Sequence, residues 1–252
     1  MKHLDPWSDL RAYTAARLAL GRCGASLPTD EILRFGLAHA AARDAVQRQL
    51  DVDALARRLR DAGLESLPAA SAAADRTTFL LRPDLGRRLS EASRTRLSAA
   101  AGSDAASDLL LVVADGLSAP AIDRNALPML DAIRRQARPG WQIGPVVVAT
   151  QARVALGDEI GELLGASLVA VLIGERPGLS SPDSLGIYLT WQPRRGRRDA
   201  ERNCISNIRP EGLAYEDAAA RLWWLCGEAR QLRLTGVQLK DRSSQARLVN
   251  PS

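Results

Sequence analysis

A loop of charged, rigid and small residues follows one apolar run and is the segment of this chain best suited to chemistry. Residues 174–178, Gly-Glu-Arg-Pro-Gly, come directly after the apolar residues 168–173. Such a run is typical of a buried strand, and open parallel sheets bind ligands where their strands end. We therefore expect Glu175 and Arg176 either to lie at a ligand site or to form a structural ion pair in a tight loop.

Two earlier apolar runs are followed by comparable segments. Asp115 and Ser118, after residues 109–114, could contact a ligand, although a turn and a helix N-cap is the simpler interpretation of this pair. After residues 145–149, Gly157 and Gly161 are four residues apart and share one face of a predicted helix. Residues without side chains let that helix approach the sheet or a ligand closely, and packing on the sheet is the simpler interpretation.

A fourth polar segment, residues 202–210, contains Cys204. A cysteine nucleophile needs a base nearby, and the two histidines of the chain, His3 and His39, are both in its N-terminal part. A packed cysteine is therefore the simpler interpretation, and a metal site built from several histidines is excluded. The basic run just before it, residues 194–198, is typical of a solvated loop.

Composition narrows the class of protein. The 252 residues are 46% apolar and 25% charged, as in an ordinary soluble protein, and no apolar run approaches the ~20 residues that span a bilayer. The net charge is +5, but 4% aromatic residues give few stacking platforms for nucleic acid. Three widely spaced cysteines and a start without an apolar signal favour the cytoplasm. Glycine-rich phosphate-binding turns of the P-loop or dinucleotide type are missing from the sequence.

The elements that position these segments fall into two regions. From residue 104 onward, strands and helices alternate, which indicates an α/β domain with a doubly wound, mostly parallel sheet. Residues 1–103 have helical periodicity and predict a small all-helical region that docks on a partner or on the second domain. We expect strands over 109–114, 145–149, 168–173 and 186–191, helices over 9–20, 29–46 (capped by Thr29), 52–62, 84–101, 119–137, 151–164 and 215–234, and a small-residue linker over 66–74.

Taken together, these segments resemble the small subunit of ethanolamine ammonia-lyase, an adenosylcobalamin-dependent enzyme. The resemblance covers most of the chain, and the combination of segments is specific. It is carried by residues 114–118, 151–161, 174–184 and 204–208, with further similarity at residues 18–22 and 82–88.

The resemblance implies a division of labour in a hetero-oligomer. A large subunit, a TIM barrel, holds ethanolamine and converts it to acetaldehyde and ammonia by radical chemistry. The Rossmann-like domain of the small subunit, residues 104–252, forms one wall of the cobalamin site and contributes neither catalytic nor metal-ligating residues. The cobalt keeps its own dimethylbenzimidazole, because the chain lacks an Asp-x-His-x-x-Gly motif. Location inside a bacterial microcompartment is left open.

Carried over residue by residue, the cobalamin contacts of the small subunit fall on Val154, Glu175 and Cys204. Val154 would contact the corrin edge, Glu175 would accept hydrogen bonds from corrin amides, and Cys204 would contribute packing or backbone groups. Adjacent residues give three secondary candidates, Gly174, Arg176 and Ser206.

Two other classes of function stay open at this point. A self-sufficient α/β hydrolase would use Ser118 or Cys204 as its nucleophile, but it would lack a nearby histidine base. A basic adaptor would bind nucleic acid with an affinity that falls steeply with salt.

Overall fold

A mixed six-stranded sheet forms the centre of the protein. The computed structural model describes residue 5 and residues 7–14, 16–101 and 107–243. The strand order is β1-β3-β2-β4-β5-β6, in which β1, β3, β2 and β4 are parallel and β5 and β6 are antiparallel to their neighbours. The strands are β1 (Ser66–Ala70), β2 (Leu109–Ala114), β3 (Ile143–Thr150), β4 (Leu168–Gly174), β5 (Leu185–Trp191) and β6 (Asn203–Ile208).

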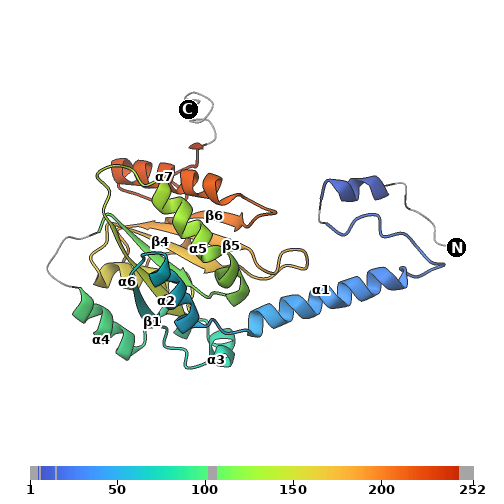
Figure 1. Ribbon diagram of the computed structural model, residues 1–252, viewed down its shortest axis with the longest axis horizontal. Coiled ribbons are helices and arrows are strands. Elements are labelled where there is room, and N and C mark those ends of the chain that lie inside the picture. Colours follow the sequence, from blue (N-terminus) through green and yellow to red (C-terminus); the bar gives the residue numbers. More distant parts are fainter. Residues whose placement is uncertain (1–4, 6, 15, 102–106, 244–252) are drawn as a thin grey trace.

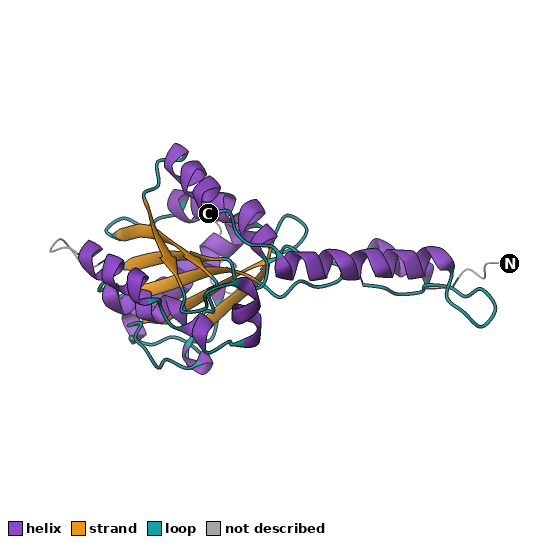
Figure 2. Ribbon diagram, turned by 90° about the horizontal axis from the view of Figure 1, so that it is seen from below, coloured by secondary structure: helices purple, strands orange, loops and turns teal. Residues whose placement is uncertain are grey.

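Helices cover both faces of this sheet, as Figures 1 and 2 show. We call the face under α2 (Val52–Asp61), α5 (Ala119–Arg135) and α7 (Tyr215–Leu232) the first face, and the face under α4 (Glu91–Ala100) and α6 (Leu156–Leu163) the second face. Alternate residues of each central strand point to opposite cores, because successive side chains of a strand point to opposite sides. The prediction of a mixed α/β protein is therefore confirmed.

The N-terminal region differs from its prediction. The expected linker over 66–74 is wrong, because Ser66–Ala70 is β1, which pairs in parallel with β3 at the edge of the sheet. Residues 1–103 are therefore not all helical. The expected helix over 9–20 is only a short 3-10 helix at Ser8–Ala12, and the expected helix over 84–101 is a 3-10 turn followed by α4. A short helix, α3 (Arg76–Leu81), was not anticipated.

The remaining predicted elements are found with shifted ends. The strands over 109–114, 145–149, 168–173 and 186–191 are β2 to β5, and the predicted long helices are α1 (Thr29–Gln47), α2, α5, α6 and α7. Thr29 is the first residue of α1, whose N-cap is Pro28, and α6 begins five residues later than expected. Within the described residues, none of the helices is long and apolar enough to cross a membrane.

One element stands apart from the body. Figures 1 and 2 show α1 projecting from the sheet domain, with the preceding segment folded back beside it. Only Glu31 and Ala45 of its 19 residues are buried.

Candidate functional site at the carboxyl edge of the sheet

The parallel strands β2 and β3 lie side by side and send their chains to opposite faces, into α5 and α6 respectively. Such a switch point opens a crevice at the carboxyl ends of the strands. Asp115, the first residue after β2, lies at this switch point. Its buried carboxylate accepts the backbone N–H groups of Gln151 (2.9 Å) and Ala152 (3.0 Å) and the Nη1 of Arg76 (3.3 Å). Burial raises the pKa of Asp115, and the two N–H donors oppose that shift.

The Asp115 carboxylate holds the turn that carries Val154. Gln151 has a φ of 52°, a left-handed conformation that is uncommon for a residue with a side chain. Two donated N–H bonds at Gln151 and Ala152 stabilise this conformation, and the Arg153 N–H donates to Gly86 O (2.8 Å). Val154 follows as a half-buried residue that packs against the core of the second face, just before α6.

Gly174 is required by packing against the loop after β2. A Cβ at Gly174 would lie 2.1 Å from the backbone oxygen of Ser118, and a Cβ at Gly116 would lie 2.3 Å from Gly174 O. Gly116 also has a φ of 54°, which favours glycine. The two strand-end loops therefore meet in backbone contact, and Gly174 is buried between them.

Glu175 leaves this packed edge and turns toward β5 and β6. Its Oε2 accepts the hydroxyl of Ser184 (2.7 Å), and the Asn207 N–H lies 3.3–3.4 Å from both carboxylate oxygens. A Cβ at Gly186 would lie 2.9 Å from Glu175 Oε1, so the carboxylate rests directly over a glycine of β5. The side chain of Glu175 is thus held at the carboxyl edge over the second face.

Cys204 lies beside this carboxylate but within the sheet. The sequence analysis expects no strand in the polar segment 202–210 and so places Cys204 beyond the sheet, which is wrong, because Asn203–Ile208 is β6. Cys204 pairs with Tyr188 of β5 across the antiparallel ladder, so the thiol and the phenol lie next to each other on one face of the sheet. Partial desolvation raises the pKa of the Cys204 thiol, and the nearby Glu175 charge raises it further, while the Tyr188 hydroxyl opposes the shift. Burial also raises the pKa of Tyr188, above its usual value.

The secondary candidates have different settings. Arg176 is exposed, and its charge, with those of Arg76 and Arg87, adds to burial in lowering the pKa of Arg153. This interaction links the turn after β3 with the loop after β4. Ser206 is exposed on β6, two residues beyond Cys204. We call Glu175, Gly186, Tyr188, Cys204 and Ser206 the open face.

Comparison with known proteins identifies the family. The sequence model of the ethanolamine ammonia-lyase light chain (EutC) matches residues 4–240. The small subunit of ethanolamine ammonia-lyase from Azotobacter vinelandii is 56% identical over 97% of this chain and 91% of its own length. This chain belongs to that family. Small subunits from Pseudomonas aeruginosa LESB58 (57% identical, 95% of this chain, 88% of theirs) and Pseudomonas syringae pv. tomato (54%, 95% and 84%) are also similar. The resemblance stated from the sequence is thus confirmed.

A nucleophilic role for Ser118 does not fit this member of the family. Ser118 is fully buried, its hydroxyl donates to Pro182 O (2.8 Å), and it caps α5 by accepting the Ala121 N–H (3.3 Å). The turn-and-cap interpretation of this segment is therefore confirmed. The raised pKa of Cys204 likewise disfavours the thiolate that a nucleophile needs. Within the part of the chain that the structure describes, groups of three or more potential metal ligands are absent.

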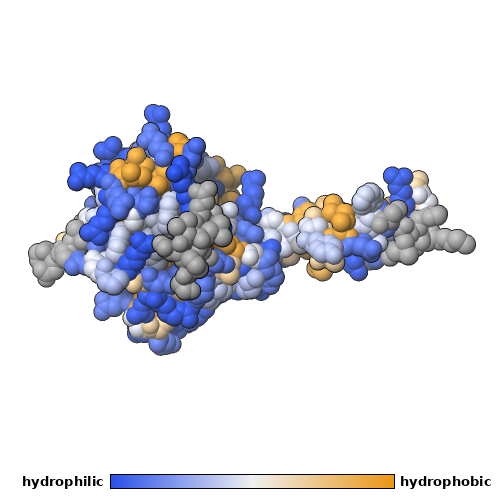
Figure 3. Space-filling model, turned by 90° about the horizontal axis from the view of Figure 1, so that it is seen from above, coloured by the Kyte–Doolittle hydropathy of each residue, from blue (hydrophilic) through white to orange (hydrophobic). Residues whose placement is uncertain are grey.

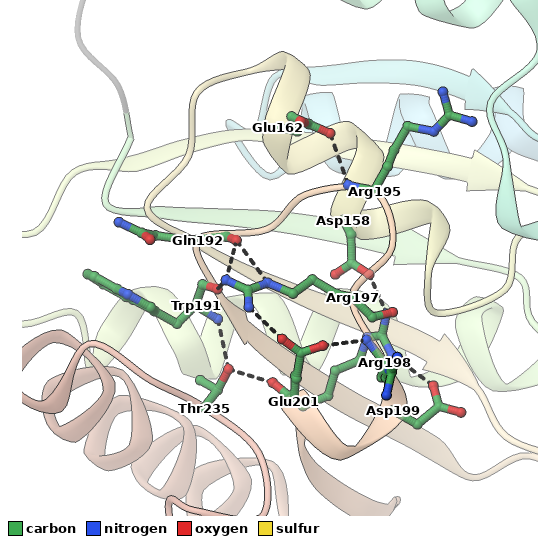
Figure 4. Close-up of polar contacts among 11 residues, drawn as sticks. Asp158, Glu162, Trp191, Gln192, Arg195, Arg197, Arg198, Asp199, Glu201 and Thr235 are labelled. Carbon is green, nitrogen blue, oxygen red and sulfur yellow. Dashed lines mark hydrogen bonds and ion pairs between the residues drawn. The ribbon is translucent and has the colours of Figure 1, made fainter.

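The basic run at residues 194–198 is a loop in which four of the five residues are exposed, so the expected solvated loop is confirmed, and Arg197 is its half-buried member. Arg197 donates to the backbone oxygens of Trp191 and Gln192 and pairs with Glu201 (2.5 Å), as Figure 4 shows. Arg202 pairs with Asp158 of α6 in a fully buried contact. This network ties the end of β5 to α6 and the start of β6.

The sequence interpretation missed Tyr188, Ser184 and Asn207, which surround Glu175 and Cys204. Their proximity depends on the register between β5 and β6, which the local sequence does not specify. The helix glycines were predicted correctly. A Cβ at Gly157 would lie 2.2 Å from Val171 of β4, and one at Gly161 would lie 2.4 Å from Pro193, so α6 packs directly on the sheet and on the loop after β5.

Proposed function

We propose that this chain is the small subunit of an adenosylcobalamin-dependent ethanolamine ammonia-lyase and that its open face forms one wall of the cobalamin site. The observation that carries the proposal is the family match over residues 4–240, which spans every segment named above. A large subunit would hold ethanolamine and close the site from the other side. When bound, the cofactor supplies the radical chemistry that converts ethanolamine to acetaldehyde and ammonia.

The residues of the open face fit a large ligand with amide substituents. A side chain at Gly186 would collide with the Glu175 carboxylate, so this part of the sheet is flat beside an acceptor that Ser184 holds in place. Cys204 and Ser206 are exposed next to it. A flat surface beside a hydrogen-bonded carboxylate suits a planar macrocycle whose edges carry N–H donors.

The chain's own residues would bind and orient the ligand. Glu175 would accept N–H bonds from amide substituents with the lone pairs that Ser184 and Asn207 leave free, and Val154 would give an apolar contact. Cys204 would pack through a neutral thiol, since the surroundings raise its pKa. Arg176 and Ser206 are secondary contacts, and Gly174 would act through packing, because it is buried under the loop after β2.

Two further parts of the proposal concern the ligand and the location. The two histidines of the chain, His3 and His39, are far in sequence from the open face, which is consistent with a cobalt that keeps its dimethylbenzimidazole. We also propose a Rossmann-like cobalamin-binding domain over residues 104–252, to which β1 adds an edge strand. A cytoplasmic location, inside or outside a bacterial microcompartment, stays a prediction.

The test is ethanolamine-dependent acetaldehyde formation with adenosylcobalamin. We expect activity when this chain is co-expressed with its cognate large subunit and none from either chain alone. Glu175→Ala should weaken cobalamin binding to the complex by about 1–3 kcal/mol, because it leaves ligand donors unpaired. Glu216→Ala, an exposed carboxylate on α7, is the matched control. Turnover by this chain alone, or cobalamin binding that Glu175→Ala leaves unchanged, would contradict the proposal.

A further inference from the structure

The segment that projects from the body is a helical arm, which we define as the described residues 7–14 and 16–47. Its N-terminal part folds back along α1. Arg11 donates to Leu18 O (2.8 Å) and Ala19 O (2.7 Å) and pairs with Glu31 (3.2 Å), and the guanidinium of Arg17 lies 5.3 Å from the ring centre of Phe35. The arm is therefore held together by contacts between its own residues.

Uncovered apolar side chains concentrate on this arm. Of the thirteen large apolar side chains that are exposed in the described part of the chain, nine lie on it. Figure 3 shows hydrophobic patches, in orange, on the part of the molecule that projects from the body. Leu33 and Leu37, one turn apart on α1, are 67% and 74% exposed. The nine are Trp7, Leu10, Tyr13, Leu18, Leu27, Ile32, Leu33, Phe35 and Leu37.

This distribution is unusual for a surface that faces water. Most of the stability of a protein helix comes from packing one apolar face, and an isolated helix of this length is marginal in water. Large exposed apolar patches mark interaction sites. Gly36, between Leu33 and Leu37, has open space where a side chain would be, which leaves room for a close approach by another chain.

The root of the arm lies at the same edge of the sheet as the open face. Arg76 joins them, because its Nε donates to Val46 O of α1 (2.7 Å) and its Nη1 contacts Asp115 (3.3 Å), which holds the turn before Val154. Arg48, just after α1, pairs with Asp123 of α5 (3.0 Å). In Figure 1 the arrow of β6 points to the side from which α1 projects. A chain that covers the open face therefore lies within reach of an arm about 28 Å long.

We propose that the apolar surface of the arm docks on the large subunit, so that the small subunit holds its partner by the arm as well as by the wall of the cofactor site. This inference rests on the proposed function. The arm and the open face would form one continuous interface, because both begin at the carboxyl edge of the sheet. A second copy of this chain is the alternative partner for the apolar surface of the arm.

The test is the affinity of the full-length chain for its cognate large subunit without cofactor, measured by sedimentation velocity and by titration with a labelled large subunit. The double substitution Leu33→Glu/Leu37→Glu should weaken the complex about tenfold or more, because both residues would lose apolar contact and bury a charge. The matched control is Leu232→Glu/Val237→Glu, which changes two exposed apolar residues at the opposite edge of the sheet. Circular dichroism and thermal unfolding of each isolated variant check that the sheet domain is intact.

The outcomes separate this inference from the proposed function. A wild-type complex that only the arm substitutions weaken supports docking on the large subunit. A wild-type complex that the arm substitutions leave unchanged overturns the inference while the proposed function stands. Wild-type self-association that the arm substitutions abolish, with unchanged affinity for the large subunit, assigns the arm to a second copy instead. Failure of the wild-type chains to associate counts against the proposed function itself.

Discussion

The second face of the sheet is closed over β1 to β4 and open over β5 and β6, toward the carboxyl edge of the parallel strands. Under α4 and α6 the side chains of Leu110, Val112 and Ala114 are completely or almost completely buried. On β6, Cys204 is exposed on this side, whereas Ile205, its neighbour on the first face, is buried under α7. Antiparallel strands can leave one face to solvent, and parallel strands are normally covered on both. The candidate site therefore coincides with the change from parallel to antiparallel pairing.

The two parts are also held by different forces. The closed part depends on close backbone packing and buried charge, as at Gly157 against Val171 and Asp158 against Arg202. The open part depends on a few hydrogen bonds around Glu175 at its rim. Substitutions in the closed part should therefore change stability, and substitutions in the open part should change binding with little effect on stability.

The largest expected effect is on the buried pair of the closed part. Arg202→Ala should lower the free energy of unfolding by about 3–5 kcal/mol, because it leaves Asp158 as a buried charge without its partner. Urea unfolding followed by circular dichroism measures this change. The control is Arg202→Met combined with Asp158→Leu, which removes both charges and should lose clearly less. An equal loss in both variants would show that the cost comes from packing and not from the uncompensated charge.

Asp115 lies between the two parts and should affect both. Asp115→Asn places an amide donor against the N–H groups of Gln151 and Ala152, so at least one buried donor loses its acceptor. We expect a loss of about 1–3 kcal/mol in the free energy of unfolding. Cobalamin affinity of the complex should fall as well, because the turn that holds Val154 depends on these bonds. Unchanged cobalamin affinity in a folded variant would remove Val154 from the proposed site.

The sequence predicts the closed part better than the open part. Strands β2 to β5 can be predicted from their apolar runs, because one or both of their faces are buried. The sequence does not predict β1, because this strand is short and rich in alanine. It also contains Pro68, which is tolerated in an edge strand. The sequence does not predict β6 either, because its residues on the second face, Cys204 and Ser206, are polar. Only Ile205 and Ile208 indicate a strand.

For the candidate site, the sequence predicts which residues follow a strand end but not the contacts between them. Glu175 could be placed at a strand end, since it follows an apolar run, but its contacts with Ser184 and Asn207 depend on how two later strands pair. Ionic contacts such as Arg76 with Asp115 join residues 39 positions apart. Pairings of this kind arise from the tertiary arrangement, and local periodicity carries no signal for them.

A smaller effect is expected on the open part from Gly186→Ala. The new Cβ would lie 2.9 Å from Glu175 Oε1, so the carboxylate must shift while the backbone stays in place. We expect a change of less than about 1 kcal/mol in the free energy of unfolding, since the obstacle is the end of a side chain, together with weaker cobalamin binding to the complex. The control is Gly178→Ala, in the loop that carries Glu175, because a Cβ at Gly178 would meet no atom closer than 3.7 Å. A large loss of stability would show that Glu175 is rigidly fixed and not adjustable.

The smallest expected effect concerns the charge of Cys204. Desolvation raises the pKa of this thiol, so at pH 8.5 the folded protein holds less thiolate than the unfolded chain and should react more slowly with iodoacetamide. The ratio of folded to unfolded rates should rise toward one as the pH passes the raised pKa, and mass spectrometry of the Cys204 peptide measures both rates. Tyr188→Phe should slow the folded protein further, because the hydroxyl that stabilises the thiolate is lost, whereas Tyr215→Phe on the first face should not. Faster alkylation in the folded protein would contradict a neutral Cys204 and would reopen the possibility of a reactive thiol on the open face.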